Sequence, residues 1–334
     1  MEPFFFSIII PVYNTANYVA SCLNSILIQN LDQALYEVLL IDDGSSDCSY
    51  QVLREYEKCF KNVIVIRKVN EGVSIARNVG IMNSRGRYIL FVDSDDSLGE
   101  DSLSNLYHML SVNDVDILVG RSFNSISHLK QNECYGFPEE FLGLSFSGIQ
   151  LTVDRLFFRG SVCGVAFSSD FLRRYQLTFI EGLEIAEDFL FFVSCCLYAQ
   201  RVEFIDNFIY LINQREGSAS RSVDFEKVFS MTNNLRRVDG LIRSNDWTNS
   251  QLSILNFCQY TVISNMFNMF YSCFSLTRYL KIVGEIRDIG ISKLNIGDIK
   301  ICRGKVQIFN ISIWIFSAFV FFKQFINRGA KYLS

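Results

Sequence analysis

Three carboxylates lie within four residues at Asp93-Ser94-Asp95-Asp96, directly after the apolar run 88–92. Carboxylates this close repel one another unless a positive charge lies among them. Divalent cations such as Mg²⁺ or Mn²⁺ prefer oxygen ligands and commonly bridge protein carboxylates to substrate phosphates. The segment therefore predicts a cation and phosphate site. The alternative is a solvated turn in which Asp96 caps the next helix.

A second acidic segment, Asp42-Asp43-Gly44-Ser45, ends the apolar run 36–41. Its carboxylates could accept hydrogen bonds from the base or ribose of a nucleotide. The segment is also a good turn and helix cap, in which Gly44 serves the turn. The residues alone leave these two interpretations equally open.

Arg77 lies one turn inside a predicted helix that begins near Gly72. It could bind a phosphate or a base, or it could pair with one of the nearby aspartates. Farther along, Glu187 and Asp188 lead into a very apolar helix. A partly desolvated carboxylate there would suit a general base, whereas acids in a first helical turn also simply complement the helix dipole.

The elements that must position these residues alternate between strand and helix. Continuous apolar runs predict buried strands at 5–12, 36–41, 63–67 and 88–92. Apolar residues at helical spacing predict helices at 15–29, 46–59 and 72–83. This alternation predicts an α/β fold with a doubly wound, mostly parallel sheet, whose ligand lies outside the carboxyl ends of the strands.

The pattern is less regular beyond residue 114 and becomes helical beyond residue 224. We expect an irregular stretch at 124–148, a helix at 187–199, a strand at 208–213, and helices at 228–244, 250–274 and 277–288. We place a domain boundary after residue 220, which gives a catalytic domain at 1–220 and a helical C-terminal region at 221–334.

Composition excludes several classes of protein. The 334 residues are 49% hydrophobic and 20% charged, which excludes disorder. The net charge of −4 gives no support for nucleic-acid binding. The two histidines, His108 and His128, leave little room for Ser-His-Asp or His-ligated zinc chemistry. Ten cysteines without a C-x-x-C pair, and a start without a basic signal region, indicate reduced thiols in the cytoplasm.

Together these segments resemble glycosyltransferase family 2, whose members have the GT-A fold. The matching segments, in order and spacing, are 7–14 (SIIIPVYN), 41–47 (IDDGSSD), 70–80, 86–89 (GRYI), 93–96 (DSDD) and 187–188. The resemblance implies inverting, metal-dependent transfer of a sugar from a nucleotide diphosphate to an acceptor hydroxyl. It also implies which residues bind the donor: Pro11, Val12, Tyr13, Asp43, Arg77, Asp93 and Ser94. Asp95 would hold the Mn²⁺ or Mg²⁺ ion, and Asp188 would be the general base.

The resemblance also suggests the donor, the acceptor and the biosynthetic process. We expect a UDP-sugar donor, a lipid-linked glycan acceptor, and a place in capsule, O-antigen or exopolysaccharide synthesis. No Q-x-x-R-W signature occurs, so one sugar is expected per encounter. One alternative is a sugar-nucleotide nucleotidyltransferase, which would show a glycine-rich loop that residues 11–17 lack; another is a non-catalytic scaffold. Arg215 and Arg221 could belong to a loop that closes over the donor, or to a plain surface loop.

The most apolar stretch of the chain is 306–322, which falls short of the roughly 20 residues of a spanning helix. Residues 293–334 contain seven basic residues and one acidic residue, a local charge of +6. A basic segment around an apolar helix suits peripheral attachment to the inner face of the cell membrane. A membrane span, a core helix and an oligomer contact are the alternatives.

Overall fold

The structure is a computed structural model that describes residues 4–124, 134–183, 185–213, 224–244, 246–270, 275–297, 299 and 303–320. The chain divides into two compact units. The first comprises Met1–Gly148, Phe158–Gly182 and Phe191–Glu216. The second comprises Ile149–Phe157, Leu183–Leu190 and Gly217–Ser334.

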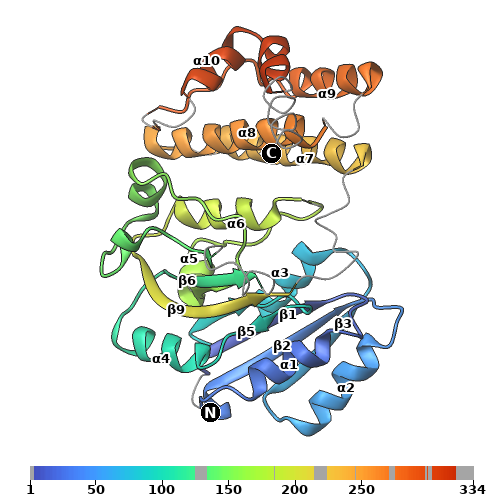
Figure 1. Cartoon of the computed structure of the whole chain (residues 1–334), viewed down its shortest axis with the longest axis vertical. Helices are drawn as coiled ribbons and strands as arrows, with labels where there is room; N and C mark the ends of the chain where they lie inside the picture. The colour runs from blue at the N-terminus through green and yellow to red at the C-terminus, as the bar shows by residue number, and fades with distance from the viewer. Residues whose placement is uncertain are drawn as a thin grey trace, which may run out of the picture. The chain divides into compact units, whose positions relative to one another are not determined.

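A single sheet forms the centre of the first unit (Figure 1). Its described strands are β1 (Phe6–Val12), β2 (Tyr36–Asp43), β3 (Val63–Lys68), β4 (Tyr88–Phe91), β5 (Ser97–Leu98), β6 (Ile117–Asn124), β7 (Cys134–Tyr135), β8 (Val165–Ser168) and β9 (Val202–Ile212). Their order across the sheet is β3-β2-β1-β4-β8-β6-β9-β5, and β7 pairs with β6.

The N-terminal half of the sheet is parallel. Strands β3, β2, β1 and β4 run in one direction, and β2 is buried at every position, as expected for a strand covered on both faces. Beyond β4 the pairing is mixed, because β8 runs antiparallel to both β4 and β6 while β6 and β9 are parallel. The predicted α/β fold is confirmed, with four adjacent parallel strands in the first half of the sheet and mixed pairing in the second.

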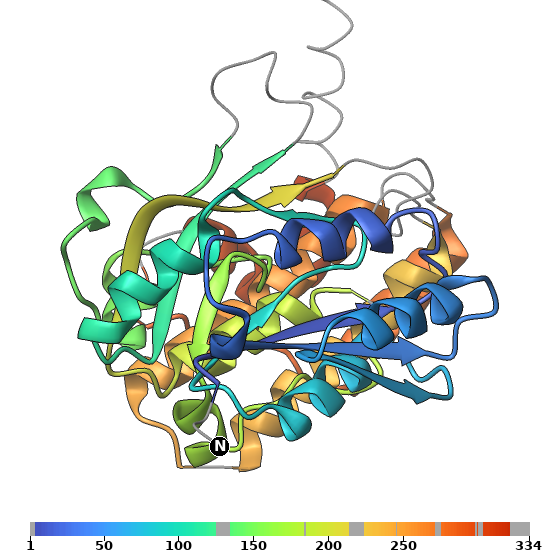
Figure 2. The same ribbon diagram turned by 90° about the horizontal axis from the view of Figure 1, so that it is seen from below.

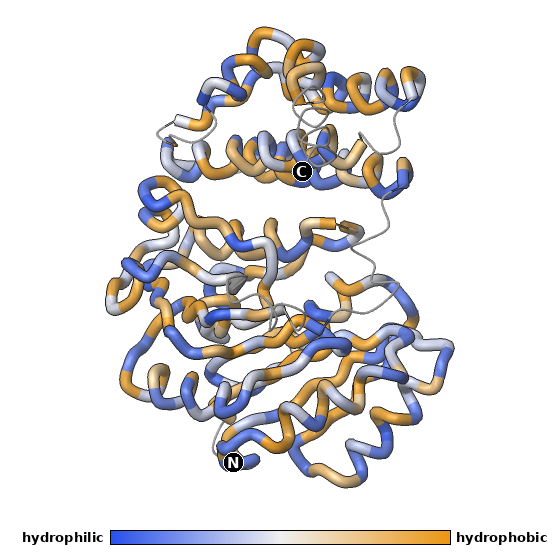
Figure 3. Tube along the Cα trace, in the orientation of Figure 1, coloured by the Kyte–Doolittle hydropathy of each residue, from blue (hydrophilic) through white to orange (hydrophobic). Residues whose placement is uncertain are grey.

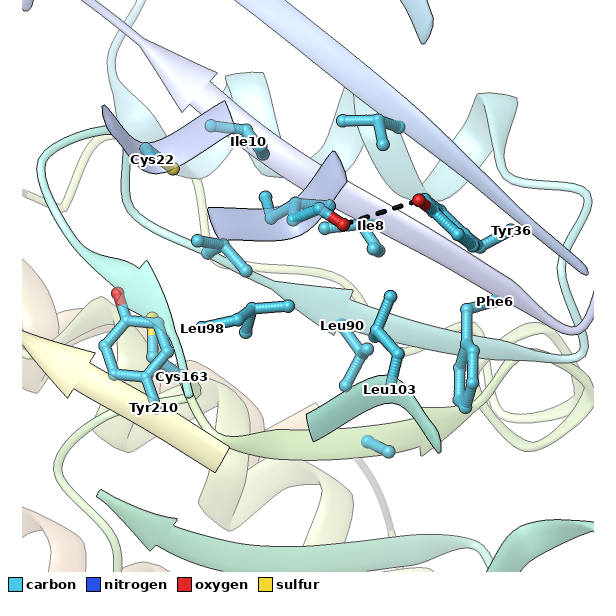
Figure 4. Packing of buried hydrophobic residues seen from close by; sticks show 14 of the residues in the cluster. Phe6, Ile8, Ile10, Cys22, Tyr36, Leu90, Leu98, Leu103, Cys163 and Tyr210 are labelled. Atoms are coloured by element: carbon cyan, nitrogen blue, oxygen red, sulfur yellow. Dashed lines mark hydrogen bonds between the residues drawn. The ribbon is translucent and has the colours of Figure 1, made fainter. Parts of the chain in front are cut away.

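Helices cover both faces of the sheet (Figure 2). Those of the first half are α1 (Val19–Leu27), α2 (Ser49–Cys59), α3 (Val73–Asn83) and α4 (Ser102–Val112). Side chains of α1, α2 and α4 join one buried core with alternate residues of β1, among them Phe6, Ile8 and Ile10 (Figure 4). On the other face α3 lies close to β1, since a Cβ atom on Gly80 would be 2.3 Å from Cγ2 of Ile9.

Two further helices are α5 (Ser169–Arg174) and α6 (Glu187–Cys196), and α6 contributes residues to both units. Shorter turns cover Gln33–Leu35, Glu139–Phe141 and Gln150–Asp154. The second unit contains α7 (Phe225–Ser244), α8 (Asn249–Phe270), α9 (Leu276–Asp288) and α10 (Arg303–Ile311), followed by a helix at 313–320. Within it α7 packs against α8 and α9.

Several element boundaries differ from those predicted. The helix expected from residue 15 begins at Val19, the strand expected at 208–213 extends back to Val202, and the helix expected at 187–199 ends at Cys196. The apolar stretch 306–322 is divided at Ser312, which is not helical. None of the described helices combines the length and apolar character that crossing a membrane requires.

Candidate functional site

The loops that follow β1, β2 and β4 meet at the carboxyl edge of the sheet. The Asn14 N–H donates to Oγ of Ser45 at 3.1 Å, and the side-chain oxygen of Asn14 accepts the Ser46 N–H at 2.9 Å. The Thr15 hydroxyl donates to Oγ of Ser94 at 3.0 Å. The predicted strand ends therefore form one connected edge.

The first of these loops exposes the ring of Tyr13. Half of the Tyr13 surface is exposed, whereas the Val12 side chain is fully buried in the core and Pro11 is partly buried. Asn14 has φ of 52°, a left-handed conformation that asparagine tolerates better than most residues, and its side-chain hydrogen bonds hold it there. Tyr13 can thus stack on a flat ligand, while Val12 could reach a ligand only through its backbone.

Asp43 fixes the segment that leads into α3. Its Oδ1 accepts hydrogen bonds from Nζ of Lys68 at 2.5 Å and from the Glu71 N–H at 3.0 Å, and its Oδ2 accepts the Gly72 N–H at 2.9 Å. Burial lowers the pKa of Lys68, but its bonds to Asp43 and Glu71 outweigh burial and raise that pKa above its ordinary value. A carboxylate oxygen has two lone pairs, so Oδ2 can accept one more hydrogen bond from a ligand.

Arg77 and Asp93 form an ion pair at the edge. Nη2 of Arg77 lies 2.9 Å from Oδ1 of Asp93, and the guanidinium lies over the Phe179 ring, 5.1 Å from its centre. The Arg77 side chain is 3% exposed, but that of Asp93 is 37% exposed. The buried cation therefore orients a carboxylate that still faces solvent. The structure shows the pairing of Arg77 with an aspartate, and binding of the donor by Arg77 stays a prediction.

The end of β9 holds the acidic turn 93–96, a feature that the sequence analysis missed. The Tyr210 hydroxyl accepts the Asp93 N–H at 3.1 Å and donates to Oδ2 of Asp96 at 2.6 Å. The Asn213 N–H donates to Oδ1 of Asp96 at 2.7 Å, and its side-chain amide donates to the Asp95 carbonyl at 3.2 Å. A tyrosine and an asparagine in the otherwise apolar stretch 208–213 (FIYLIN) were the available signal.

Asp96 differs electrostatically from its neighbours. Burial raises its pKa to about 7, and the nearby charges of Asp93 and Asp95 act in the same direction, while the Tyr210 hydroxyl opposes them. Because both oxygens of Asp96 accept hydrogen bonds within the protein, Asp96 is a structural member of the turn. This leaves Asp93 and Asp95 as the carboxylates that can face a ligand.

A divalent cation is compatible with this donor set. The described residues contain no group of three or more His, Cys, Asp or Glu side chains that could hold a metal ion. Asp95 is partly exposed, as is Asp93, and both follow the buried strand β4. One or two carboxylates, completed by substrate phosphate oxygens and water, are the usual protein ligands of Mg²⁺, so the residues fit a cation that binds together with its substrate.

Asp188 lies in the first turn of α6 and is 8% exposed. The turn before it contains Ala186 at φ of 62°, and the Asn234 side chain of α7 donates to the Ile185 carbonyl at 2.7 Å. Asp188 belongs to the second unit, whereas the other eight predicted site residues belong to the first. Arg215 and Arg221 lie outside the described residues.

Sequence comparisons connect this edge to known enzymes. The model of the family "Glycosyl transferase family 2" matches residues 7–172. Poly(ribitol-phosphate) beta-glucosyltransferase of Bacillus spizizenii is 32% identical over 214 residues, which are 63% of this chain and 32% of that protein. The uncharacterized glycosyltransferase EpsJ of Bacillus subtilis is 31% identical over 221 residues, 64% of this chain and 62% of that protein. The chain thus matches about a third of the first relative's length and under two thirds of the second's.

Solved structures share the fold. Residues 1–349 of Staphylococcus aureus TarS, crystallised with UDP-GlcNAc, superpose with a TM-score of 0.69 at 24% identity, over 86% of this chain and 80% of that one. A mannosyltransferase of Pyrobaculum calidifontis in complex with GDP-Man and Mn²⁺ gives a TM-score of 0.52 at 13% identity, over 86% and 82% of the two chains. The segment 7–172 that the family model matches contains the ends of β1, β2 and β4, whose loops meet at the carboxyl edge, and through it this chain belongs to glycosyl transferase family 2.

Proposed function

We propose that this chain is an inverting, non-processive glycosyltransferase that moves one sugar from a nucleotide-diphosphate donor to a hydroxyl of a glycan. The observation that carries the proposal is the connected edge at which Tyr13, Asp43 and the Arg77-oriented Asp93 lie on hydrogen-bonded loops. An aromatic ring, a buried acceptor and exposed carboxylates are the groups that a base, a ribose and a cation-bound diphosphate require.

The donor we propose is a UDP-sugar. The exposed Tyr13 ring would stack on the base, the remaining lone pair of Asp43 Oδ2 would accept a base N–H, and Asp93 would accept a ribose hydroxyl. S. aureus TarS, which shares the fold, was crystallised with UDP-GlcNAc, and this supports uridine as the base.

The cation would be held by Asp95, with Asp93 beside it, because these are the partly exposed carboxylates of the turn. When bound, Mn²⁺ or Mg²⁺ would neutralise negative charge on the departing diphosphate. The Mn²⁺ ion in the P. calidifontis mannosyltransferase structure supports this choice. The hydroxyl oxygen of Ser94 accepts a hydrogen bond from the Thr15 hydroxyl, and this bond would hold the turn 93–96 against the loop after β1.

Asp188 would act as the general base. Its carboxylate would take the proton of the acceptor hydroxyl while the hydroxyl oxygen forms a bond to the anomeric carbon. The bond from that carbon to the diphosphate oxygen breaks on the opposite face, so the configuration inverts. Burial of Asp188 at the start of α6 suits a base, because a poorly hydrated carboxylate accepts protons more readily.

The acceptor we propose is a lipid-linked glycan of a bacterial surface polysaccharide, such as a capsule, O-antigen or teichoic acid. The relatives that act on poly(ribitol phosphate) support this class of polymer. The basic C-terminal region would attach the chain peripherally to the cytoplasmic face of the membrane, where such acceptors are assembled.

The test is UDP release from a panel of UDP-sugars with Mn²⁺ and a lipid-linked glycan. We expect release from at least one donor, with turnover lowered about 10²–10⁴-fold by Asp188→Asn, the usual contribution of a general base. Asp170→Asn is the matched control, since Asp170 is an exposed aspartate in the first turn of α5. Full turnover in Asp188→Asn would show that another group is the base.

A further inference from the structure

The C-terminal helices present an apolar surface to solvent. Ile311, at the end of α10, is 75% exposed, and Trp314, Ile315 and Phe319 of the following helix are also exposed. We call these four residues the apolar ridge. Hydrophilic and hydrophobic residues both occur along α10 (Figure 3). Large apolar side chains that gather on a surface usually mark a site of contact with a protein or a membrane.

Packing inside the second unit fixes which side of helix 313–320 faces outward. Phe316 is fully buried and its ring contacts Phe309, Tyr260 and Phe267. The Ser317 hydroxyl is hydrogen bonded to the Tyr279 hydroxyl of α9. The ridge therefore cannot turn inward without breaking this core. It is a fixed surface of the unit.

A cavity of about 480 Å³ lies beside the ridge. Its polar lining comes from Arg287, Ser292, Asn310 and Ser312, and Ile311 and Trp314 of the ridge line its apolar side. Arg287 is exposed in the last turn of α9, and within the described part of the chain no carboxylate forms a salt bridge with it. A guanidinium and two hydroxyls next to a tryptophan match a phosphate group that is attached to an apolar chain.

The net charge of the C-terminal segment, counted from its sequence, argues for an anionic partner. Residues 293–334 carry +6 within a chain of −4, so the rest of the chain carries −10. Lys293 is exposed next to Leu294, whose backbone N–H and carbonyl form hydrogen bonds of 2.7 and 2.8 Å with the Asn310 side chain at the ridge. A second copy of the chain would bring two such basic segments together across a twofold axis, which is unfavourable. An anionic bilayer surface complements them.

We propose that the apolar ridge lies in the interface of an anionic phospholipid bilayer, with Trp314, Ile315 and Ile311 at the level of the headgroups. Arg287, with Ser292 and Ser312, binds a lipid phosphate in the adjacent cavity. The inference extends the peripheral attachment proposed above from a basic region to a defined surface and a class of ligand. A tryptophan beside cations is typical of helices that lie in a membrane interface.

Vesicle flotation of the full chain tests this surface. We expect it to float with phosphatidylglycerol–phosphatidylcholine vesicles, more weakly with phosphatidylcholine alone, and less at high salt. Ile311→Glu should weaken binding about tenfold or more, a loss of at least about 1.4 kcal/mol. Ile28→Glu is the matched control, since Ile28 is 79% exposed and belongs to the first unit. Equal losses in both variants, or no flotation of the unmodified chain, would overturn the proposal.

Two further measurements separate the possible ligands. In Trp247→Phe, Trp314 is the single tryptophan, and its emission should shift to the blue with phosphatidylglycerol vesicles. Arg287→Glu should reduce the preference for phosphatidylglycerol, and millimolar inorganic phosphate should not compete if the ligand is a lipid. If phosphate competes fully, or if Ile311→Glu only converts an oligomer to a monomer, the lipid assignment is wrong. UDP release in vesicle-free buffer tests the enzymatic proposal separately.

Discussion

The Tyr210 hydroxyl joins two parts of the acidic turn through one oxygen atom, between the Asp93 N–H and the Asp96 carboxylate. The ring is buried in the core near Leu98 and Cys163 (Figure 4), so only its hydroxyl reaches the turn. Tyr210→Phe would leave a partly buried N–H and a buried carboxylate oxygen without this partner. We expect a loss of about 1–3 kcal/mol in the free energy of unfolding.

The same change should affect the donor site, because Asp93 and Asp95 belong to the turn that Tyr210 holds. We expect KM for the donor to rise on the order of tenfold. Tyr36→Phe is the control: Tyr36 is a fully buried tyrosine whose hydroxyl bonds to the Ile26 carbonyl at 3.4 Å. Urea unfolding and donor kinetics measure both effects. An unchanged KM in Tyr210→Phe would mean that the turn holds its geometry without the hydroxyl.

Asp96 should make stability depend on pH. Its pKa is about 7 in the folded chain and 3.8 ordinarily, so between these values the folded state binds a proton that the unfolded state has lost. The free energy of unfolding should therefore fall as pH rises from about 4 to about 7, by at most about 1.4 kcal/mol per pH unit. Asp96→Asn should flatten this dependence in urea titrations with a chelator present, and identical slopes would contradict the assignment.

At the level of elements, α3 carries Arg77 to the edge only because Gly80 lets the helix lie against β1. A Cβ atom on residue 80 would be 2.3 Å from the Ile9 side chain, which is fully buried. Gly80→Ala should cost about 1–3 kcal/mol in unfolding free energy through overpacking, and it should weaken donor binding by displacing Arg77.

Gly240→Ala is the matched control for this prediction. Gly240 is also inside a helix, α7, but a Cβ atom there would meet nothing within 4 Å. Alanine should stabilise that helix by about 0.5–1 kcal/mol. Thermal or urea unfolding of the two variants should show opposite signs. Equal effects would mean that close packing of α3 on β1 does not decide the outcome.

Helices and strands were predictable from the sequence where the local pattern of apolar residues determines the secondary structure. Each continuous apolar run of the parallel half is a strand, because strands covered on both faces, as β1 and β2 are, consist mainly of apolar residues. The start of α1 was missed because Asn14 and Thr15 form hydrogen bonds with the distant segment 45–49 instead of beginning the helix. The break at Ser312 was also missed, since nothing in the apolar spacing of 306–322 marks it.

Over the whole molecule, the sequence predicts which residues at the ends of adjacent strands come together, but it does not predict which distant residues join them. Tyr13, Asp43 and Asp93 lie at the carboxyl ends of neighbouring parallel strands, so topology alone brings them to one edge. Tyr210 reaches the turn from 114 residues away in sequence, through a strand that pairs with β6 and β5. Such long-range pairing leaves no local signal.

The proposed function requires that this edge bind a nucleoside diphosphate through a cation held by Asp95. Calorimetric titration of UDP into the full chain, with Mn²⁺ and with a chelator, tests it most directly. We expect binding that is at least about tenfold tighter with Mn²⁺, abolition of that difference in Asp95→Ala, and its retention in Asp170→Asn. UDP binding that is unaffected by Mn²⁺, or by the loss of Asp95, would show that Asp95 holds no cation for the diphosphate.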